Sequence, residues 1–338
     1  MEILKDYSLK ILNTFGIEAK TKYFTEVNNL TGLLQALEQL DKLHVPHLML
    51  GGGSNILFTK DFDGLTIKNS LMGIKVIEET PDNILIEAGG GENWSGFVQY
   101  CIDRNYGGIE NLILIPGCVG AAPIQNIGAY GVEIKETFHS LQAIELATGI
   151  TREFKALECN FGYRDSIFKR ELKNRYVIIK VRFLLAKNPA VNLNYEAVRK
   201  GVEEAGVTNP TIKDIGRIIS EIRMAKLPNP AVVGNAGSFF KNPEIKLEKY
   251  QEIKEKYPDI KSFPTESGNI KIPAAWLIEK SGWKGKRVGN TGSYEKQALA
   301  LVNYGGATGK EVYELSQKIM DSVSGMFGIE LEREVNII

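Results

Sequence analysis

The chain has three cysteines and three histidines, and neither set has the spacing of a metal site or a disulfide framework. An odd number of widely separated cysteines suits a reducing compartment. The six residues are Cys101, Cys118, Cys159, His44, His47 and His139. We therefore expect no bound metal, so the chemistry must come from carboxylate, Arg, Lys, Ser or Tyr side chains or from an organic cofactor.

Three consecutive glycines lie in a loop, residues 51–55, between two predicted strands at 47–50 and 56–58. No helix follows the loop, which excludes the dinucleotide-binding and P-loop phosphate motifs, because both use a helix N-terminus. Three glycines can still turn their N–H groups inward around a pyrophosphate, such as that of a flavin dinucleotide. A tight hairpin turn is the alternative, and this loop alone favours the turn.

A second stretch, residues 116–131, has almost no bulky charged side chain. Such a segment lets the backbone approach a flat ligand closely and offers N–H groups to its edge. For this stretch alone, a buried loop packed on itself is an equal alternative. The two glycine-rich loops together favour a large planar cofactor.

Four long motifs occur in the order typical of one enzyme family, and the chain resembles the UDP-N-acetylenolpyruvoylglucosamine reductases from near residue 13 to near residue 335. The resemblance implies an α+β fold, with a non-Rossmann FAD-binding domain of the vanillyl-alcohol-oxidase type and a C-terminal α+β substrate domain. It also implies a UDP-N-acetylmuramate dehydrogenase, which uses FAD and NADPH to reduce UDP-N-acetylglucosamine enolpyruvate for the bacterial cell wall. The motifs are residues 50–55, 115–131, 161–169 and 235–243.

The resemblance implies which residues contact the flavin. No His or Cys is placed convincingly for a covalent tether, so we expect non-covalent FAD. The implied cofactor-binding residues are Gly51, Gly52, Gly53, Ser54, Asn55, Pro116, Gly117, Gly120, Ala122, Asn126 and Gly128.

The resemblance assigns catalysis to Arg164, Ser238 and Glu334. Reduction of the enol ether leaves carbanion character beside a carboxylate, so the site needs groups that stabilise negative charge and an acid that protonates carbon. The guanidinium of Arg164 suits a carboxylate, and Ser238 becomes the proton donor. Each residue has a plain alternative: an ion pair for Arg164, a turn for Ser238 and a solvated position for Glu334.

The resemblance also implies a set of substrate-binding residues. Two of them, Lys226 and Lys284, carry compact charges suited to a diphosphate. Tyr195 lies in an insertion that marks the subtype whose tyrosine loop closes over the substrate, which would exclude water. The full set is Tyr163, Tyr195, Lys226, Asn242, Lys284 and Gln297.

The chain departs from the family pattern in two places. Phe263 stands where some relatives have a tyrosine that contacts the nucleotide, and loss of the hydroxyl puts that one hydrogen bond, but not the activity, in doubt. At the end of the chain, Arg333 and Asn336 replace a proline and an arginine. Asn336 cannot supply the charge of that arginine, which puts the surroundings of Glu334 in doubt.

The elements that must position these residues are predicted from apolar spacing and from chain breakers. Pro228 and Pro230 mark the boundary of a C-terminal unit. Helices are expected at 32–43, 93–105, 211–224, 246–256, 274–281 and 309–327, and strands at 47–50, 56–58, 65–67, 74–77, 84–88, 141–146 and 176–185. We expect FAD-binding subdomains at 1–69 and 70–227, a substrate-binding domain at 228–328, and a closing strand at 329–338 that returns to the first part.

The chain carries 41 Lys and Arg residues against 41 Asp and Glu residues. This balance provides no basic field that would hold nucleic acid or an anionic membrane. No apolar run approaches the roughly 18 residues of a membrane span, and residues 1–10 lack the apolar block of a signal peptide. We expect a cytoplasmic monomer whose partners are NADPH and the UDP-sugar.

Two alternatives stay open. The first is another FAD-dependent oxidoreductase on the same scaffold, such as an oxidase that uses oxygen as its acceptor. The second is a catalytically silent nucleotide-binding module that has kept the fold. The presence of Arg164, Ser238 and Glu334 argues against the silent module.

Overall fold

The structure is a computed structural model, and it describes residues 1–265 and 267–338. Helices and strands are mixed along the chain, which confirms the predicted α+β class. The chain forms two compact units and passes between them several times. The first unit contains Met1–Tyr7, Thr21–Gly52 and Asp63–Ala225, and the second contains Ser8–Lys20, Gly53–Phe62 and Lys226–Ile338.

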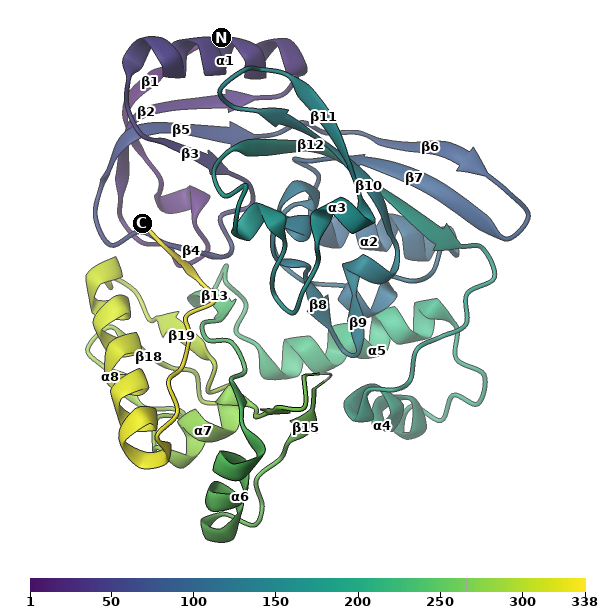
Figure 1. The fold of residues 1–338 in the computed structure, drawn as a ribbon, viewed down its shortest axis with the longest axis vertical. Coiled ribbons are helices and arrows are strands. Elements are labelled where there is room, and N and C mark those ends of the chain that lie inside the picture. The colour runs from purple at the N-terminus through teal and green to yellow at the C-terminus, as the bar shows by residue number, and fades with distance from the viewer. Residues whose placement is uncertain (266) are drawn as a thin grey trace. The chain divides into compact units, whose positions relative to one another are not determined.

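The first unit contains a four-stranded sheet covered by one helix (Figure 1). The strand order is β1 (Leu4–Ser8), β2 (Lys20–Val27), β5 (Phe62–Asn69) and β3 (His47–Leu50). Helix α1 (Leu30–Leu43) begins where the side chain of Asn29 accepts the Gly32 N–H. Its buried face, which includes Leu33 and Leu37, joins Leu65 and Ile67 of β5 in one apolar cluster.

A larger antiparallel sheet lies in the same unit. Its order is β11 (Thr151–Lys155), β10 (Phe138–Glu145), β12 (Tyr176–Ala186), β7 (Asn83–Gly89) and β6 (Ile74–Glu79). The unit also contains α2 (Trp94–Asp103), α3 (Ala156–Cys159), α4 (Glu196–Glu204) and α5 (Ile212–Lys226). The main apolar core joins the inner face of this sheet to α2, α4 and α5.

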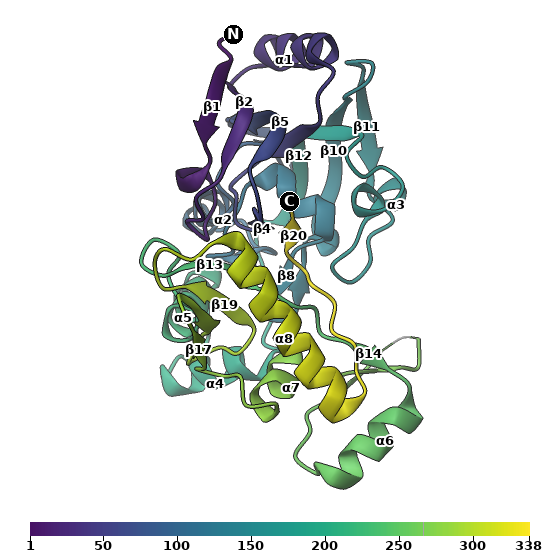
Figure 2. The same cartoon turned by 90° about the vertical axis from the view of Figure 1, so that its left-hand side faces the viewer.

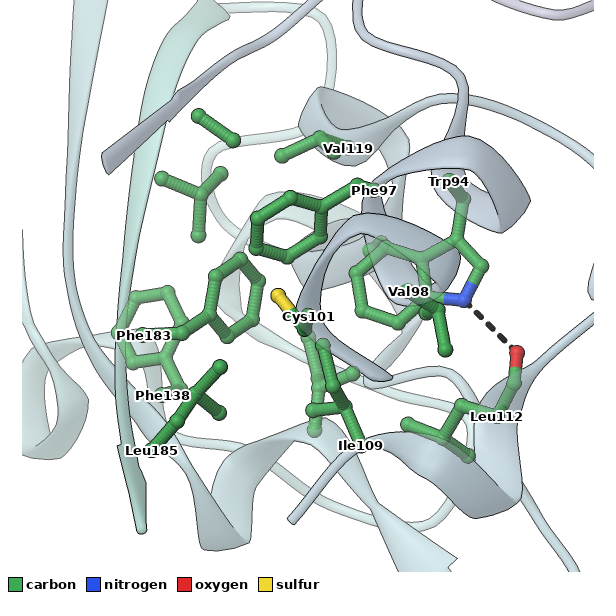
Figure 3. Close-up of a cluster of buried hydrophobic side chains, with 14 of the residues drawn as sticks. Trp94, Phe97, Val98, Cys101, Ile109, Leu112, Val119, Phe138, Phe183 and Leu185 are labelled. Carbon is green, nitrogen blue, oxygen red and sulfur yellow. Dashed lines mark hydrogen bonds between the residues drawn. The ribbon is translucent and has the colours of Figure 1, made fainter. Parts of the chain in front are cut away.

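Aromatic packing fixes α2 against β12 in this core (Figure 3). The centroid of the Phe183 ring lies 5.7 Å from that of the Trp94 ring and 5.3 Å from that of the Phe97 ring. The indole nitrogen of Trp94 donates a hydrogen bond to the Leu112 carbonyl at 2.9 Å, so the buried polar atom of this side chain is satisfied. The core therefore provides a rigid base for the loops that leave the two elements.

The second unit is built on a four-stranded sheet and a long helix (Figure 2). The sheet order is β13 (Gly234–Ser238), β19 (Ala300–Asn303), β18 (Thr291–Ser293) and β17 (Arg287–Val288). Helix α8 (Gly309–Phe327) begins with a capping box between Thr308 and Glu311 and packs on β18 and β19.

Smaller elements complete the second unit. The three-stranded sheet has the order β14 (Glu244–Ile245), β16 (Ile270–Lys271) and β15 (Phe263–Pro264). Helices α6 (Leu247–Lys256) and α7 (Ala274–Lys280) lie in the same part of the chain. Near the end of the chain, β20 (Asn336–Ile337) pairs in parallel with β4 (Ile56–Leu57).

All six predicted helices are confirmed to within a few residues. Elements that were not predicted include β1, β2, β11, α3 and α4. Of the predicted closing strand at 329–338, two residues form β20. No helix in the described ranges is long and apolar enough to cross a membrane, and those ranges contain no cluster of metal-binding side chains.

Candidate active site

The glycine loop after β3 packs directly against the second glycine-rich loop. A methyl group on Gly52 would lie 2.8 Å from the Cα atom of Gly117, and one on Gly51 would overlap the sulfur of Cys118. Because these approaches leave no room for a side chain, both positions require glycine. In the first unit, the two loops predicted to hold FAD therefore meet through their backbones.

A second glycine triplet, residues 89–91 at the end of β7, belongs to the same arrangement. The Gly90 N–H donates to the Ile179 carbonyl at 2.7 Å, and the Gly90 carbonyl accepts the Gly120 N–H at 2.9 Å. A methyl group on Gly91 would lie 2.6 Å from the Leu71 nitrogen. This triplet was not among the predicted cofactor-binding residues, although three glycines at the end of an apolar strand repeat the pattern of residues 51–53.

The rest of the second loop folds back on itself. After the 3₁₀ helix η3 (Val119–Gln125), Asn126 adopts a left-handed backbone conformation, and the short strands β8 (Gly128–Ala129) and β9 (Val132–Glu133) form a hairpin. Of the predicted cofactor-binding residues here, Pro116 is exposed, whereas Gly120, Ala122, Asn126 and Gly128 are buried. The loop therefore presents backbone groups more than side chains.

Arg164 lies in a tight turn beside this hairpin. Its backbone φ of +53° is in the left-handed region, and reciprocal backbone hydrogen bonds between Gly162 and Asp165 close the turn. The guanidinium donates to the Gly128 carbonyl at 2.7 Å and lies 5.3 Å from the ring centre of Tyr163. The Asp165 carboxylate pairs with Arg170. Arg164 is therefore attached to the predicted flavin loop.

Tyr195 lies at the start of α4, and 46% of its surface is exposed. Its ring packs edge-on against Tyr130 at a centroid distance of 5.3 Å. Burial raises the pKa of the Tyr130 hydroxyl, while a hydrogen bond from Arg223 opposes that rise. Arg223 also donates to the Leu114 carbonyl at 3.1 Å. The predicted lid tyrosine thus packs on a half-buried tyrosine–arginine pair that was not among the predicted site residues.

In the second unit, the backbone that follows Ser238 pairs with the backbone around Glu334. The Phe239 carbonyl, next to Ser238, accepts the Glu334 N–H at 2.8 Å, and the Lys241 N–H donates to the Glu332 carbonyl at 2.9 Å. The chain after β13 therefore runs antiparallel to residues 332–334. Ser238 is exposed at the end of β13, while the Phe239 side chain behind it is fully buried.

The loop before Ser238 is shaped by Asn235, which is 3% exposed. Its side chain accepts the Gly237 N–H at 2.9 Å and donates to the carbonyls of Pro228 and Val233. Gly237 has a φ of +69°, which favours glycine. These contacts fix the backbone that carries the Ser238 hydroxyl.

Both departures near Glu334 have local hydrogen-bond partners. The Asn336 side chain donates to the Asn55 carbonyl at 2.9 Å, and the Asn55 side chain donates to the Glu334 carbonyl at 3.3 Å. Arg333 donates to Ser316 and Gln317 of α8 at 2.8 and 2.7 Å. The backbone of Glu334 is therefore held on both sides.

The remaining predicted substrate-binding residues lie in the second unit and have varied surroundings. The Lys284 ammonium lies 3.1 Å from the Glu279 carboxylate, and Lys226 is exposed at the end of α5. The Asn242 side chain accepts the Ala274 N–H at 2.9 Å, and that of Gln297 accepts the Leu299 N–H at 3.4 Å. Phe263, at one of the departures from the family pattern, is 56% exposed.

The candidate residues are thus divided between the two units. The first unit carries Gly51, Gly52, the 116–131 loop, Tyr163, Arg164 and Tyr195, and the second carries Gly53, Ser54, Asn55, Lys226, Ser238, Asn242, Lys284, Gln297 and Glu334. Within the first unit, Arg164 lies beside the flavin loop. Within the second, the strand of Glu334 lies beside that of Ser238.

Comparisons with known proteins match the whole chain. Residues 22–155 match the family model of an FAD binding domain, and residues 229–338 match that of the UDP-N-acetylenolpyruvoylglucosamine reductase C-terminal domain. The fold resembles that of the UDP-N-acetylenolpyruvylglucosamine reductase of Thermus caldophilus, with a TM-score of 0.68 at 22% identity, over 99% of this chain and 98% of the other. Residues 22–155 therefore form an FAD-binding domain of the predicted type, and most of them belong to the first unit.

Sequence similarity extends over the full length of curated relatives. The UDP-N-acetylenolpyruvoylglucosamine reductase of Amoebophilus asiaticus is 48% identical, with 100% of each chain covered. The enzyme of the same name from Pseudomonas aeruginosa is 44% identical, over 100% of this chain and 99% of the relative. The chain therefore belongs to the UDP-N-acetylenolpyruvoylglucosamine reductase family.

Proposed function

We propose that this FAD-dependent oxidoreductase reduces UDP-N-acetylglucosamine enolpyruvate to UDP-N-acetylmuramate with NADPH as the hydride donor, and that Arg164, Ser238 and Glu334 are its catalytic residues. The observation that carries the proposal is the backbone pairing that brings Glu334 next to the Ser238 loop. The reaction is a step in the synthesis of peptidoglycan precursors.

The glycine loops fit a flavin dinucleotide. The close approaches of Gly52 to Gly117 and of Gly120 to Gly90 bring backbone segments together with no side chain between them, which suits a planar ligand and its pyrophosphate. The residues that hold FAD are those of the 51–55 and 116–128 loops. Bound FAD supplies the hydride-transfer chemistry that no side chain of this protein provides.

Ser238 donates the proton that completes the reduction. Its hydroxyl is exposed on a loop fixed by Asn235, and the buried Phe239 behind it gives the site an apolar wall. A serine is a weak acid, but a carbanion beside a carboxylate is a strong base, so the transfer still runs downhill. Glu334, held beside this loop, shares the proton or steadies the intermediate.

Arg164 binds the carboxylate of the enolpyruvyl group. A guanidinium offers a planar pair of donors that match a carboxylate, and it stabilises the negative charge that builds up beside that carboxylate. The Arg164 guanidinium donates a hydrogen bond to the Gly128 carbonyl at 2.7 Å. This arrangement orients the guanidinium before substrate arrives.

The UDP portion is bound by Tyr163, Tyr195, Lys226, Asn242, Lys284 and Gln297. The Lys284 ammonium is held by Glu279 at 3.1 Å, so binding a diphosphate exchanges one anionic partner for another. Tyr195 is half-exposed and packs through one edge of its ring, so it can turn toward the substrate without leaving a cavity. Its movement excludes water from the reacting groups.

The first test of the proposal is the presence and attachment of the flavin. The purified protein should be yellow, and denaturation should release FAD into the supernatant, because no Cys or His side chain is placed to tether it. Flavin that stays with the precipitated protein would contradict non-covalent binding. A colourless protein that FAD cannot reconstitute would contradict the cofactor assignment.

A second test separates the proposed activity from the alternatives. Enzyme reduced by NADPH under anaerobic conditions should be reoxidised rapidly by UDP-N-acetylglucosamine enolpyruvate and slowly by oxygen. An oxidase would show the reverse preference, and a silent module would show neither reaction. Such a substrate implies a cytoplasmic enzyme, and sedimentation at about the chain mass of 37.5 kDa would support a monomer.

A further inference from the structure

Asn126 links the predicted flavin loop to the turn that carries Arg164. It is fully buried, and its side-chain nitrogen donates to the Glu133 carboxylate at 2.9 Å and to the Gly162 carbonyl at 3.0 Å. Its side-chain oxygen accepts the Lys135 N–H at 3.2 Å. Both N–H groups of the amide are therefore used within the protein, so this side chain has no donor left for a ligand.

The backbone of Asn126 also restricts what can replace it. Its φ of +44° is in the left-handed region, which asparagine, aspartate and glycine tolerate better than other residues. Its N–H donates to the Ala122 carbonyl and ends η3. Asparagine therefore fits both the turn of the loop and the hydrogen bonds of the buried amide.

The Gly162 carbonyl that Asn126 holds lies at the start of the Arg164 turn. Arg164 itself has a φ of +53°, an unfavourable conformation for an L residue with a long side chain, which costs on the order of 1 kcal/mol and persists where the surroundings enforce it. The Lys169 ammonium also holds this turn, because it donates to the Arg164 carbonyl at 3.2 Å. Of these contacts, the hydrogen bond from Asn126 connects the turn to a fully buried side chain.

We infer that Asn126 is a positioning residue, which holds the Arg164 turn so that the guanidinium is set for the substrate carboxylate; this inference rests on the function proposed above for Arg164. It differs from the role that the resemblance implied, since Asn126 would contact FAD through its backbone alone. The two roles predict different defects. Loss of a flavin ligand weakens FAD binding, whereas loss of positioning weakens the reaction with the enolpyruvyl sugar.

The test substitution is Asn126→Asp, which keeps the size of the side chain and its tolerance for left-handed backbone. An ionised aspartate has no donor for Gly162 and would face the Glu133 carboxylate. We expect the variant to retain FAD and to be reduced by NADPH at nearly the wild-type rate. Reoxidation by the enolpyruvyl sugar should slow by about 10²-fold, the usual effect of a small misplacement of a catalytic group.

A readout independent of turnover is hydrogen exchange of the holoenzyme without substrate. Peptides that cover residues 161–166 should exchange faster in Asn126→Asp than in the wild type, while peptides of α2 and β12 should not change. Asn174→Asp is the matched control, because Asn174 also has a left-handed backbone, with a φ of +59°, but is exposed. This control should behave like the wild type in both measurements.

A second substitution separates positioning from general stability. In Asn126→Asp/Glu133→Gln, the glutamine amide can donate to the new aspartate, which removes the repulsion and restores the link between residues 126 and 133. The Gly162 carbonyl still lacks the donor from residue 126 and keeps the Asp165 N–H. We therefore expect the thermal midpoint to recover while reoxidation stays slow and exchange at 161–166 stays fast. Recovery of the thermal midpoint, the reoxidation rate and slow exchange at 161–166 together would overturn the inference, because Asn126 would then act through stability alone.

Arg164→Lys, measured beside these variants, separates failure of the inference from failure of the proposed function. If Arg164→Lys reoxidises slowly and Asn126→Asp at the wild-type rate, the inference is wrong and the role of Arg164 stands. If Arg164→Lys reoxidises at the wild-type rate, the role proposed for Arg164 is wrong, and the positioning role of Asn126 fails with it. Loss of FAD from Asn126→Asp, with normal reoxidation after reconstitution, would favour the flavin-contact role.

Discussion

Glu110 is a buried carboxyl group that no proposed step uses. It is 3% exposed and accepts the Gly108 N–H at 2.6 Å. Burial raises its pKa above the ordinary value, although hydrogen bonds from the backbone N–H groups of Gly108, Glu110 and Ile109 oppose the rise. The folded chain therefore holds this proton more tightly than the unfolded chain does.

This raised pKa makes a prediction about stability. Between the unfolded pKa of Glu110, near 4.5, and its higher folded pKa, the folded state binds more protons than the unfolded state. The contribution of Glu110 to stability therefore falls as the pH rises through that window. Relative to wild type, Glu110→Gln should be more stable at pH 8 than at pH 5, as measured by urea denaturation. A difference independent of pH would contradict the raised pKa.

The contact between Gly52 and Gly117 makes a second residue-scale prediction. A methyl group on Gly52 would meet the Gly117 backbone at 2.8 Å, so Gly52→Ala must push two loops apart. We expect a loss of about 1–3 kcal/mol in stability, typical of overpacking, together with a lower FAD content. The thermal midpoint and the flavin-to-protein ratio measure the two effects.

Gly32→Ala is the matched control for that substitution. Gly32 lies in α1 of the same unit, and its nearest contact for an added methyl group is the Asn29 side chain at 3.5 Å. Alanine favours a helix, so this variant should keep its FAD and be at least as stable as wild type. If Gly32→Ala lost as much stability and FAD as Gly52→Ala, the contact between Gly52 and Gly117 would not be the cause of those losses.

At the scale of elements, the sequence predicted helices better than strands. Helix α8 was placed correctly because its apolar residues recur at helical spacing between Thr308 and Gly328, which cap its ends. Strand β2 was missed because threonines, including Thr21 and Thr25, occupy its buried face between charged residues. Helix α4 was missed because Gly201 interrupts it and Val198 and Val202 are its buried residues.

For the candidate site, too, the sequence predicted which residues are neighbours along the chain but not which distant residues are in contact. The motifs identified each candidate residue and its neighbours along the chain. They could not show that the Phe239 carbonyl accepts the Glu334 N–H, because that pairing joins distant parts of the sequence. Nor could they show the Asn126 hydrogen bonds, since a buried asparagine in a glycine-rich loop looks like a turn residue.

The contact between Tyr195 and Tyr130 makes a prediction about the lid. Tyr195→Ala should raise KM for the UDP-sugar by about ten-fold or more, the effect of losing a hydrogen bond to a charged group, and leave flavin reduction by NADPH nearly intact. Tyr195→Phe keeps the ring that packs on Tyr130 at 5.3 Å. If Tyr195→Phe raises KM as much as Tyr195→Ala does, the effect is due to the hydroxyl. If Tyr195→Phe keeps the wild-type KM, the effect is due to the ring. Flavin reduction slowed as much as reoxidation would contradict a lid role.

At the scale of the whole molecule, the proposed catalytic residues come from both units. Arg164 belongs to the first unit, and Ser238 and Glu334 belong to the second. The loop at 51–55 contributes to each, since Gly52 ends a segment of the first unit and Gly53 begins one of the second. The sequence predicted a flavin-binding part and a substrate-binding part, and the division at 69/70 and 227/228 stays a prediction. The structure changes unit between Ala225 and Lys226.

The central claim is that Ser238 delivers the proton, and stopped-flow measurement of the two half-reactions of Ser238→Ala tests it most directly. NADPH should reduce the flavin at the wild-type rate, because that step needs no proton from Ser238. Reoxidation by the enolpyruvyl sugar should slow by about 10²–10⁴-fold, the usual contribution of a positioned general acid. Ser238→Cys, a stronger acid of similar size, should recover part of the rate. Reoxidation of Ser238→Ala at the wild-type rate, with FAD and substrate bound normally, would contradict the account.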